Sequence, residues 1–284
     1  MVTAREEMVE HQKIKELIEQ ASRWPRRALT RHNDATQIIH KLTVLADFGL
    51  TKDDPGMGTI IDNILAHQAP EGAFQSLLQV PKAYGGSGEE ELSWMSCDAP
   101  IVLHALSRFG LKDHPALAEA SNHMASLIRE NGWPCAVAPD FGNFKGPGRK
   151  DDPCPYANLI SVKALISGAG HNNQEAMNIG VEMLLTHWER QRERKIYMFG
   201  IGTTFRRVKY PFIWYDILHV LETLSRLPST HSDPRFKEMV QVLIKAQDEN
   251  GRFRAGSIWL AWKTGDLGKS ANLLPGSPCL LYAS

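Results

Sequence analysis

Four side chains in one short stretch raise the question of a metal site or an acid site. The stretch GRKDDPCPYANLIS, residues 148–161, carries Arg149 and Lys150, followed by Asp152 and Cys154. Carboxylate oxygen and thiolate sulfur are both accepted metal ligands. The residue types therefore fit a polar site that binds a metal ion or supplies an acid.

The same residues also fit an ordinary helix start. Asp is a favoured N-cap residue and Pro is favoured at the first helical position, so Asp152 and Pro153 would begin a helix. Cys154 would then be a small buried side chain. A similar choice holds for Asp98, which fits either a helix N-cap or the acid of a catalytic site.

Four repeated segments indicate which elements position these residues. Each segment has the pattern apolar–basic–x–Leu. The basic residues are His40, His104, Lys163 and His219, and they are 64, 59 and 56 residues apart. Between them, apolar residues recur at three- and four-residue steps, as in amphipathic helices, in segments 57–68, 115–131, 175–190 and 234–247. The chain is thus predicted to form consecutive hairpins, each an inner and an outer helix.

A second motif closes some of these hairpins. Gln68, Gly72 and Phe74 have the spacing Gln-x3-Gly-x-aromatic, which returns at residues 247–253. The glycine permits a left-handed exit from the helix, and the aromatic ring can pack back onto it. The glutamine is expected to hydrogen-bond backbone at the helix end of the neighbouring hairpin.

These patterns predict an all-α protein of one domain over residues 1–284. We expect an N-terminal helix at 3–22, hairpin repeats over about 34–254, and a partial last hairpin at 255–284. No long alternating stretch predicts strands. Hairpins of this kind form a closed toroid or an open solenoid, and the period alone does not choose between them.

The bulk composition excludes several classes of partner. Lys plus Arg equals Asp plus Glu at 32 each, so no global field attracts nucleic acid. No apolar run reaches the length of a membrane span, and the N-terminus is charged from its fifth residue, unlike a signal peptide. The 4 cysteines are too few and too scattered for a disulfide scaffold. A cytoplasmic protein is the expectation.

The Gln-x3-Gly-x-aromatic repeats resemble those of squalene–hopene cyclases, other terpenoid cyclases and protein prenyltransferase β subunits. The resemblance covers about residues 34–274 and implies an α/α toroid whose inner helices open on an apolar central cavity. In the cyclases the catalytic acid comes from an Asp-rich motif, of which only Asp98-Ala99 remains here. Protonating an alkene requires a carboxylic acid supported by neighbouring carboxyl groups, so a squalene-type cyclase is disfavoured.

The prenyltransferase side of the resemblance implies a zinc site. Asp152 and Cys154 match the Asp-x-Cys zinc ligands of that family, and Arg149 and Lys150 match the residues that hold its isoprenoid diphosphate. Where the family has a third ligand, His, this chain has Asp216. The resemblance thus implies the metal set Asp152, Cys154 and Asp216, with His219 as an alternative ligand one turn deeper, and a separate partner subunit.

The aromatic residues favour an apolar ligand. Aromatic faces suit an isoprenoid chain and stabilise a carbocation. They gather at the expected starts of inner helices and in the tail, at Trp94, Tyr156, Phe212, Trp214, Tyr215, Trp259 and Trp262. The repeated histidines are expected to be structural and spread around the ring.

We therefore expect a prenyltransferase-like or cyclase-like protein that binds an isoprenoid or other lipid and acts on a prenyl diphosphate. In that hypothesis Asp98, Asp152 and Asp216 are the catalytic carboxylates. Two alternatives stay open. One is a non-catalytic ligand-binding or scaffold toroid, and the other is a carbohydrate enzyme in which Asp98 and Asp216 act as acid and base across a polar groove.

Overall fold

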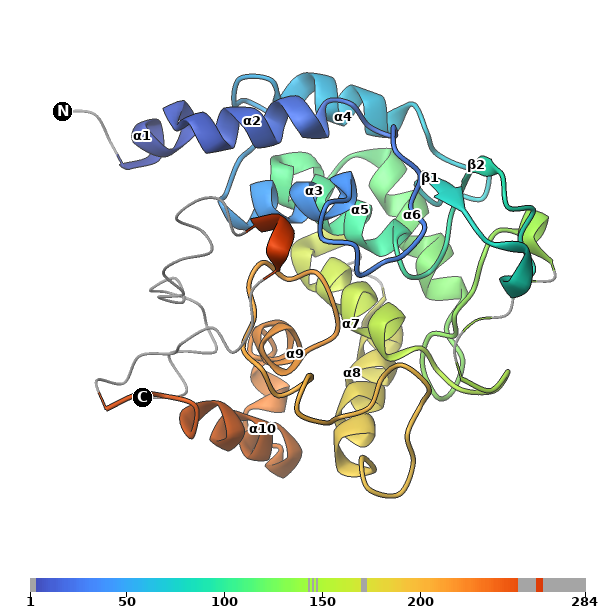
Figure 1. The fold of residues 1–284 in the computed structure, drawn as a ribbon, viewed down its shortest axis with the longest axis vertical. Coiled ribbons are helices and arrows are strands. Elements are labelled where there is room, and N and C mark those ends of the chain that lie inside the picture. The colour runs from blue at the N-terminus through green and yellow to red at the C-terminus, as the bar shows by residue number, and fades with distance from the viewer. Residues whose placement is uncertain are drawn as a thin grey trace.

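The computed structural model describes residues 4–142, 144, 146, 148–169, 173–249 and 259–262. About half of the chain is helical, and the described part contains ten α-helices and one two-stranded sheet (Figure 1). The helices are α1 Ala4–Glu10, α2 Gln12–Ala21, α3 Ile38–Asp47, α4 Met57–Leu65, α5 Ala99–Leu106, α6 Pro115–Ser126, α7 Pro155–Ala164, α8 Gln174–Glu189, α9 Ile217–Leu224 and α10 Pro234–Ile244. The predicted N-terminal helix is thus two helices, because His11 caps the start of α2.

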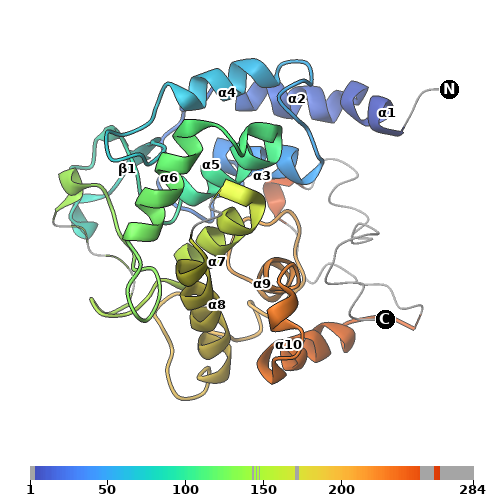
Figure 2. The same ribbon diagram turned by 180° about the vertical axis from the view of Figure 1, so that it is seen from behind.

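The hairpin prediction is confirmed for three pairs of helices, α5 with α6, α7 with α8 and α9 with α10, whereas α3 and α4 each pack on α2. Helix α3 packs on α5, α5 on α7, and α7 on α9, while α6, α8 and α10 lie outside α5, α7 and α9 respectively (Figures 1 and 2). Every residue of α7 and of α9 is buried, whereas α10 buries only the four apolar residues of one face. A covering helix is amphipathic and buries one face, whereas α7 and α9 are enclosed on all sides and bury polar residues such as Lys163 and Glu222 as well.

The expectation of a strand-free chain is wrong over a short region. Strands β1, Ser76–Gln79, and β2, Glu90–Ser93, pair antiparallel, with Ser76 opposite Ser93. The inward residues of β1 alternate with partly exposed ones. Four residues are too few for a period-two pattern to be distinguished in the sequence, so this hairpin was not predicted.

The glutamine of the repeat motif bonds as predicted. Gln68 Nε2 donates to Gly72 O and to Ala116 O, both at 2.8 Å, and Ala116 lies in the first turn of α6 in the next hairpin. Gly72 has a φ of 103°, in the left-handed region, and Phe74 is fully buried. Most of the second copy of the motif lies outside the described residues, as does most of the predicted last hairpin. There the structure describes the short turn Leu260–Trp262.

None of the described helices is both long and apolar enough to span a bilayer.

Candidate functional site

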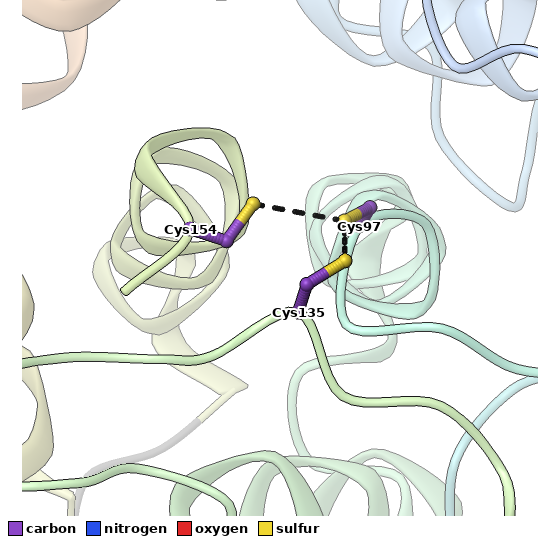
Figure 3. A group of neighbouring side chains, drawn as sticks. All are labelled: Cys97, Cys135 and Cys154. Carbon is purple, nitrogen blue, oxygen red and sulfur yellow. Dashed lines mark hydrogen bonds between the residues drawn. The ribbon is translucent and has the colours of Figure 1, made fainter. Parts of the chain in front are cut away.

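Three cysteine sulfurs meet where the N-terminal ends of α5 and α7 lie side by side (Figure 3). Cys97 Sγ lies 3.7 Å from Cys135 Sγ and 3.9 Å from Cys154 Sγ, and all three sulfurs lie within 4.8 Å of one another. Cys97 and Cys154 are buried, and Cys135 is partly exposed. Sequence reasoning missed two of the three, although Cys97 precedes one inner helix just as Cys154 precedes the next.

The local sequence fixes this thiol cluster, Cys97, Cys135 and Cys154, through backbone pairing. Cys135 lies in an extended segment held on one side by Ser96, whose Oγ donates to Pro134 O at 2.9 Å and accepts from Ala136 N at 2.9 Å. On the other side Asn158 in α7 pairs with both backbone groups of Trp133 at 2.9 Å. The segment therefore cannot move away from α5 and α7 without breaking several buried hydrogen bonds.

A glycine permits this close approach. Gly132 precedes Trp133 with a φ of 112°, a conformation that other residues rarely adopt. A Cβ at this position would lie 2.5 Å from Asn158 Oδ1, the atom that accepts from the Trp133 amide. The glycine is thus a requirement of the thiol cluster rather than of the helix exit alone.

Cys154 is the most acidic thiol of the three. Hydrogen bonds from the thiols of Cys135 and Cys97 lower its pKa well below the usual value, against the opposing effect of burial, and the Ala157 amide at 3.5 Å adds to this. Cys154 is the N-cap of α7, and a helix N-terminus favours a thiolate. The pKa values of Cys97 and Cys135 are raised, because each lies beside the other thiols in a buried position. The first negative charge of the cluster therefore resides on Cys154.

Two of the three sulfur–sulfur distances are close to those of a tetrahedral zinc site. With Zn–S bonds near 2.3 Å, a tetrahedral site places its sulfurs about 3.8 Å apart. The two closest pairs of sulfurs lie at 3.7 and 3.9 Å. Within the described part of the chain, this is the one group of three or more potential ligands close enough together to hold a metal ion.

The metal set implied by the resemblance is not assembled. Asp152 forms an ion pair with Arg194 and accepts a hydrogen bond from the Arg149 amide at 2.8 Å. Asp216 Oδ1 accepts from the His219 amide at 3.0 Å and caps α9. Of the three residues, only Cys154 belongs to the ligand group that the described residues form. The physical reason is that each carboxylate is already engaged by a guanidinium or by backbone amides.

The predicted helix start is wrong by two residues. Helix α7 begins at Pro155 with Cys154 as its N-cap, so Asp152 and Pro153 precede the helix. Asp98 does act as the N-cap of α5, accepting from the Ala99 amide at 2.6 Å.

Asp98 and Asp216 share an unusual electrostatic position. Both carboxyl groups are fully buried, and burial raises the pKa of each to about 7. In each, one oxygen accepts backbone hydrogen bonds and Oδ2 has no partner. Each carboxyl group is therefore enclosed by protein, whereas the carbohydrate alternative expects it to line a polar groove.

Arg149 and Lys150 lie on the surface. Both side chains are exposed, and the Lys150 carbonyl accepts a hydrogen bond from Arg129 at 3.0 Å. Residues 143, 145 and 147 of the preceding loop lie outside the described residues.

Most of the predicted aromatic residues do pack together. Tyr156 and Trp214 have ring centroids 4.5 Å apart, and Trp214 stacks on Phe199 at 5.5 Å. The Tyr156 hydroxyl donates to Ile213 O at 3.0 Å, and Tyr215 contacts Phe199 and Phe205. Trp259 joins through a hydrogen bond to Pro211 O at 3.1 Å. Trp94 instead contacts His123 of α6 and donates a hydrogen bond to Glu71 in the loop after α4.

Deeper in the inner helices the structure brings together three residues of the basic repeat. His104, Lys163 and His219 line one cavity of about 10 Å³, together with Tyr156 and Phe212. The expectation that the repeated histidines would be spread apart around the ring is therefore wrong for His104 and His219. The signal was present in the sequence, because residues at one register of successive inner helices face one common centre.

Lys163 is the charged residue of this centre. Its Nζ lies 3.5 Å from Glu222 Oε2 and 4.6 Å from the centroid of Phe212, and both ionic side chains are about 5% exposed. Phe212 also stacks on His219, with centroids 4.9 Å apart. Burial and the nearby Lys163 charge lower the pKa of His219 to about 3 and that of His104 well below the usual value.

Comparison of the chain with known protein families, with curated proteins and with solved structures finds no match to any of them.

Proposed function

We propose that the protein is a zinc-dependent α/α toroid in which Cys97, Cys135 and Cys154 hold the metal ion. The observation that carries this proposal is the sulfur spacing of 3.7 and 3.9 Å, which is the spacing of thiolates around tetrahedral zinc. Cys97 and Cys154 lie at the starts of inner helices, so the metal would lie where the resembling prenyltransferases open their cavity.

The toroid part of the proposal has support from electrostatics across the centre. Burial raises the pKa of Asp47, at the end of α3, to about 6, and Lys163 of α7 and Glu222 of α9 both influence it. His40 of α3 likewise influences the pKa of His219 in α9. The first and last inner helices therefore lie within electrostatic reach of each other, as a closed ring of hairpins requires.

Three protein ligands leave one zinc coordination position for a water molecule or a substrate group, as in catalytic zinc sites. Zinc bound there would lower the pKa of that water, or of a substrate thiol in the same position, and make it a nucleophile at neutral pH. The chain's own contribution is to hold the thiolates in place and to provide the first negative charge at Cys154.

Metal content tests the proposal directly. Purified protein, dialysed without chelator and titrated with Zn²⁺ against a chromophoric competitor, should bind one ion per chain. Co²⁺ in its place should give the intense near-ultraviolet band of thiolate-to-metal charge transfer. Cys97→Ser, Cys135→Ser and Cys154→Ser should each weaken binding by at least about 10-fold, because even losing a residue that only hydrogen-bonds a metal ligand costs about 10–100-fold in affinity.

Asp152→Asn and Asp216→Asn are the matched controls, because they alter the carboxylates of the set implied by the resemblance. Both should bind zinc as the unaltered protein does. A loss of zinc in either of them, or a wild-type protein without a stoichiometric tight site, would overturn the thiolate assignment.

For the substrate we propose an apolar isoprenoid, in keeping with the resemblance of the repeats. The supporting observation is the group of Tyr156, Phe199, Trp214 and Tyr215, whose rings form a chain of contacts that begins at Tyr156, two residues after Cys154. A non-hydrolysable prenyl diphosphate analogue should quench tryptophan fluorescence, and Trp214→Leu should reduce the quenching. A protein that binds the analogue and zinc but transfers no prenyl group to an acceptor thiol would be a non-catalytic binding toroid.

A further inference from the structure

The small cavity among the inner helices is lined in part by three side chains whose polar atoms lack a hydrogen-bond partner. His104 Nε2, His219 Nε2 and Lys163 Nζ are each buried without a hydrogen bond, and all three residues line the cavity. They come from α5, α9 and α7 respectively. Polar groups in protein interiors are almost always hydrogen-bonded. Three polar atoms without a hydrogen bond around one cavity therefore indicate a bound molecule.

The hydrogen bonds at the other ring nitrogen fix the proton on each imidazole. His219 Nδ1 lies 3.1 Å from Trp214 O, a carbonyl that can only accept, so Nδ1 carries the hydrogen. The Ser167 hydroxyl donates to Lys163 O at 2.9 Å, and its oxygen therefore accepts from His104 Nδ1 at 2.6 Å. Both imidazoles thus present a bare Nε2 lone pair.

Lysine completes the set with the opposite polarity. Lys163 Nζ can only donate, and its contact with Glu222 at 3.5 Å is an ion pair rather than a close hydrogen bond. Its positive charge is felt by both imidazoles, whose pKa values it lowers. The three atoms without a hydrogen bond therefore offer two acceptors and one donor to whatever occupies the cavity.

This combination excludes most small ligands. A metal ion or an ammonium ion would meet the Lys163 charge, and an anion would meet two imidazole lone pairs and the Glu222 carboxylate. An alcohol hydroxyl has one hydrogen, so it could satisfy only one imidazole. A volume of about 10 Å³ is near the least that one water needs, and such a water needs two to four polar partners.

We propose that His104, Lys163 and His219 hold one internal water molecule, which donates a hydrogen bond to each imidazole and accepts one from the lysine. The water joins three inner helices through side chains of the repeat. It lies at the register at which three of the four hairpins place their basic residue, so it is a built part of the packing among these helices rather than filler.

Counting long-lived water molecules in solution tests this proposal. Oxygen-17 magnetic relaxation dispersion of the full-length protein should show one fewer long-lived water in the double variant His104→Leu, His219→Leu. Ile160→Val lines the same cavity, keeps every polar group and removes one methylene, so it should keep the water. An equal count in the protein and the double variant would overturn the proposal.

Two measurements on the unaltered protein keep the test independent of whether the variants fold. Nitrogen-15 NMR should show Nε2 of His104 and of His219 unprotonated and accepting a hydrogen bond. A high-resolution crystal structure should show one density peak within about 3 Å of both Nε2 atoms and of Lys163 Nζ. A protonated Nε2, an empty cavity, or a peak with the anomalous signal of a halide or metal would each refute the assignment.

Discussion

Two buried clusters lie on the same inner helices and have opposite chemistry. The thiol cluster is at the helix starts, and the His104, Lys163 and His219 centre lies deeper. On α7, Cys154 and Lys163 are nine residues apart, which is about 13 Å along a helix. Both clusters contain groups that could ligate a metal, yet only the first has no fixed positive charge among its members.

This difference shows that one charged side chain can decide whether a buried group of potential metal ligands binds a cation. Two bare imidazole nitrogens would suit a transition metal, but the lysine beside them makes the same space unfavourable for any cation. The thiols instead gain charge as they deprotonate, which attracts a cation.

Lys163→Met should destabilise the protein by about 3 kcal/mol, because it leaves the buried Glu222 carboxylate with Arg226 as its remaining cation. Cys154→Ala in metal-free protein should cost less, about 1–2 kcal/mol, since it removes a small buried group. Guanidinium unfolding at pH 7 measures both. The double variant Lys163→Met, Glu222→Gln should recover much of the loss, and equal costs for Lys163→Met and Cys154→Ala would remove the contrast.

Zinc at 100 times its dissociation constant should raise the free energy of unfolding by about 2.7 kcal/mol. The gain requires the thiol cluster and not the deeper centre. Cys154→Ser should therefore abolish it, whereas His219→Gln should retain it. Thermal unfolding with and without zinc provides the measurement. If the zinc effect disappeared in His219→Gln, the metal would bind at the deeper centre and not at the thiol cluster.

Asp216 is the N-cap of α9, and His219 lies three residues further along the chain. The two should give opposite pH dependences of stability. The pKa of Asp216 is raised to about 7, so the folded state holds its proton more tightly and stability falls as pH rises from about 4 to 7. The pKa of His219 is lowered to about 3, so stability falls as pH drops below about 6.5. Each slope approaches about 1.4 kcal/mol per pH unit.

In the unaltered protein the two contributions to stability have opposite slopes between about pH 4 and 6.5 and partly cancel. Variants that lack one of the two groups separate them. Asp216→Asn keeps an N-cap residue and should become more favourable relative to the unaltered protein as pH rises from 5 to 8. His219→Gln should become more favourable as pH falls from 7 to 5. Unfolding free energies at each pH measure this, and parallel curves for a variant and the parent would contradict its assigned shift.

Tyr156→Phe should have the smallest effect, about 1 kcal/mol of stability, because it removes a single hydrogen bond to Ile213 O. Tyr156 lines the deeper cavity and also follows Cys154 by two residues. The change should therefore leave zinc affinity and the internal water in place. A loss of either in Tyr156→Phe would mean that the two clusters are coupled through this ring.

The sequence was informative wherever a pattern repeated. The basic residues at His40, His104, Lys163 and His219 located all four inner helices, and the Gln68 motif predicted a contact that the structure contains. Repetition works because each hairpin buries the same face against its neighbour, so the constraint recurs in every unit.

The candidate site was only partly predictable because it depends on contacts between distant segments. Cys135 belongs to no repeat, and Asn158 and Ser96 bring it to Cys97 and Cys154. Asp152 matched a metal-binding motif, but Arg194, 42 residues away, takes its carboxylate. Sequence spacing indicates which residues lie at the same helix end. It does not indicate that a residue outside the motif, here Arg194, binds the Asp152 carboxylate.

The two hydrogen bonds of Gln68 have a consequence for how the protein opens. The side chain closes its own turn at Gly72 and at the same time holds Ala116 of α6. Fluctuations of the first hairpin and of α6 should therefore be shared, and their amide protons should exchange with solvent at matched rates rather than hairpin by hairpin. Gln68→Ala would split this cooperative unit into two.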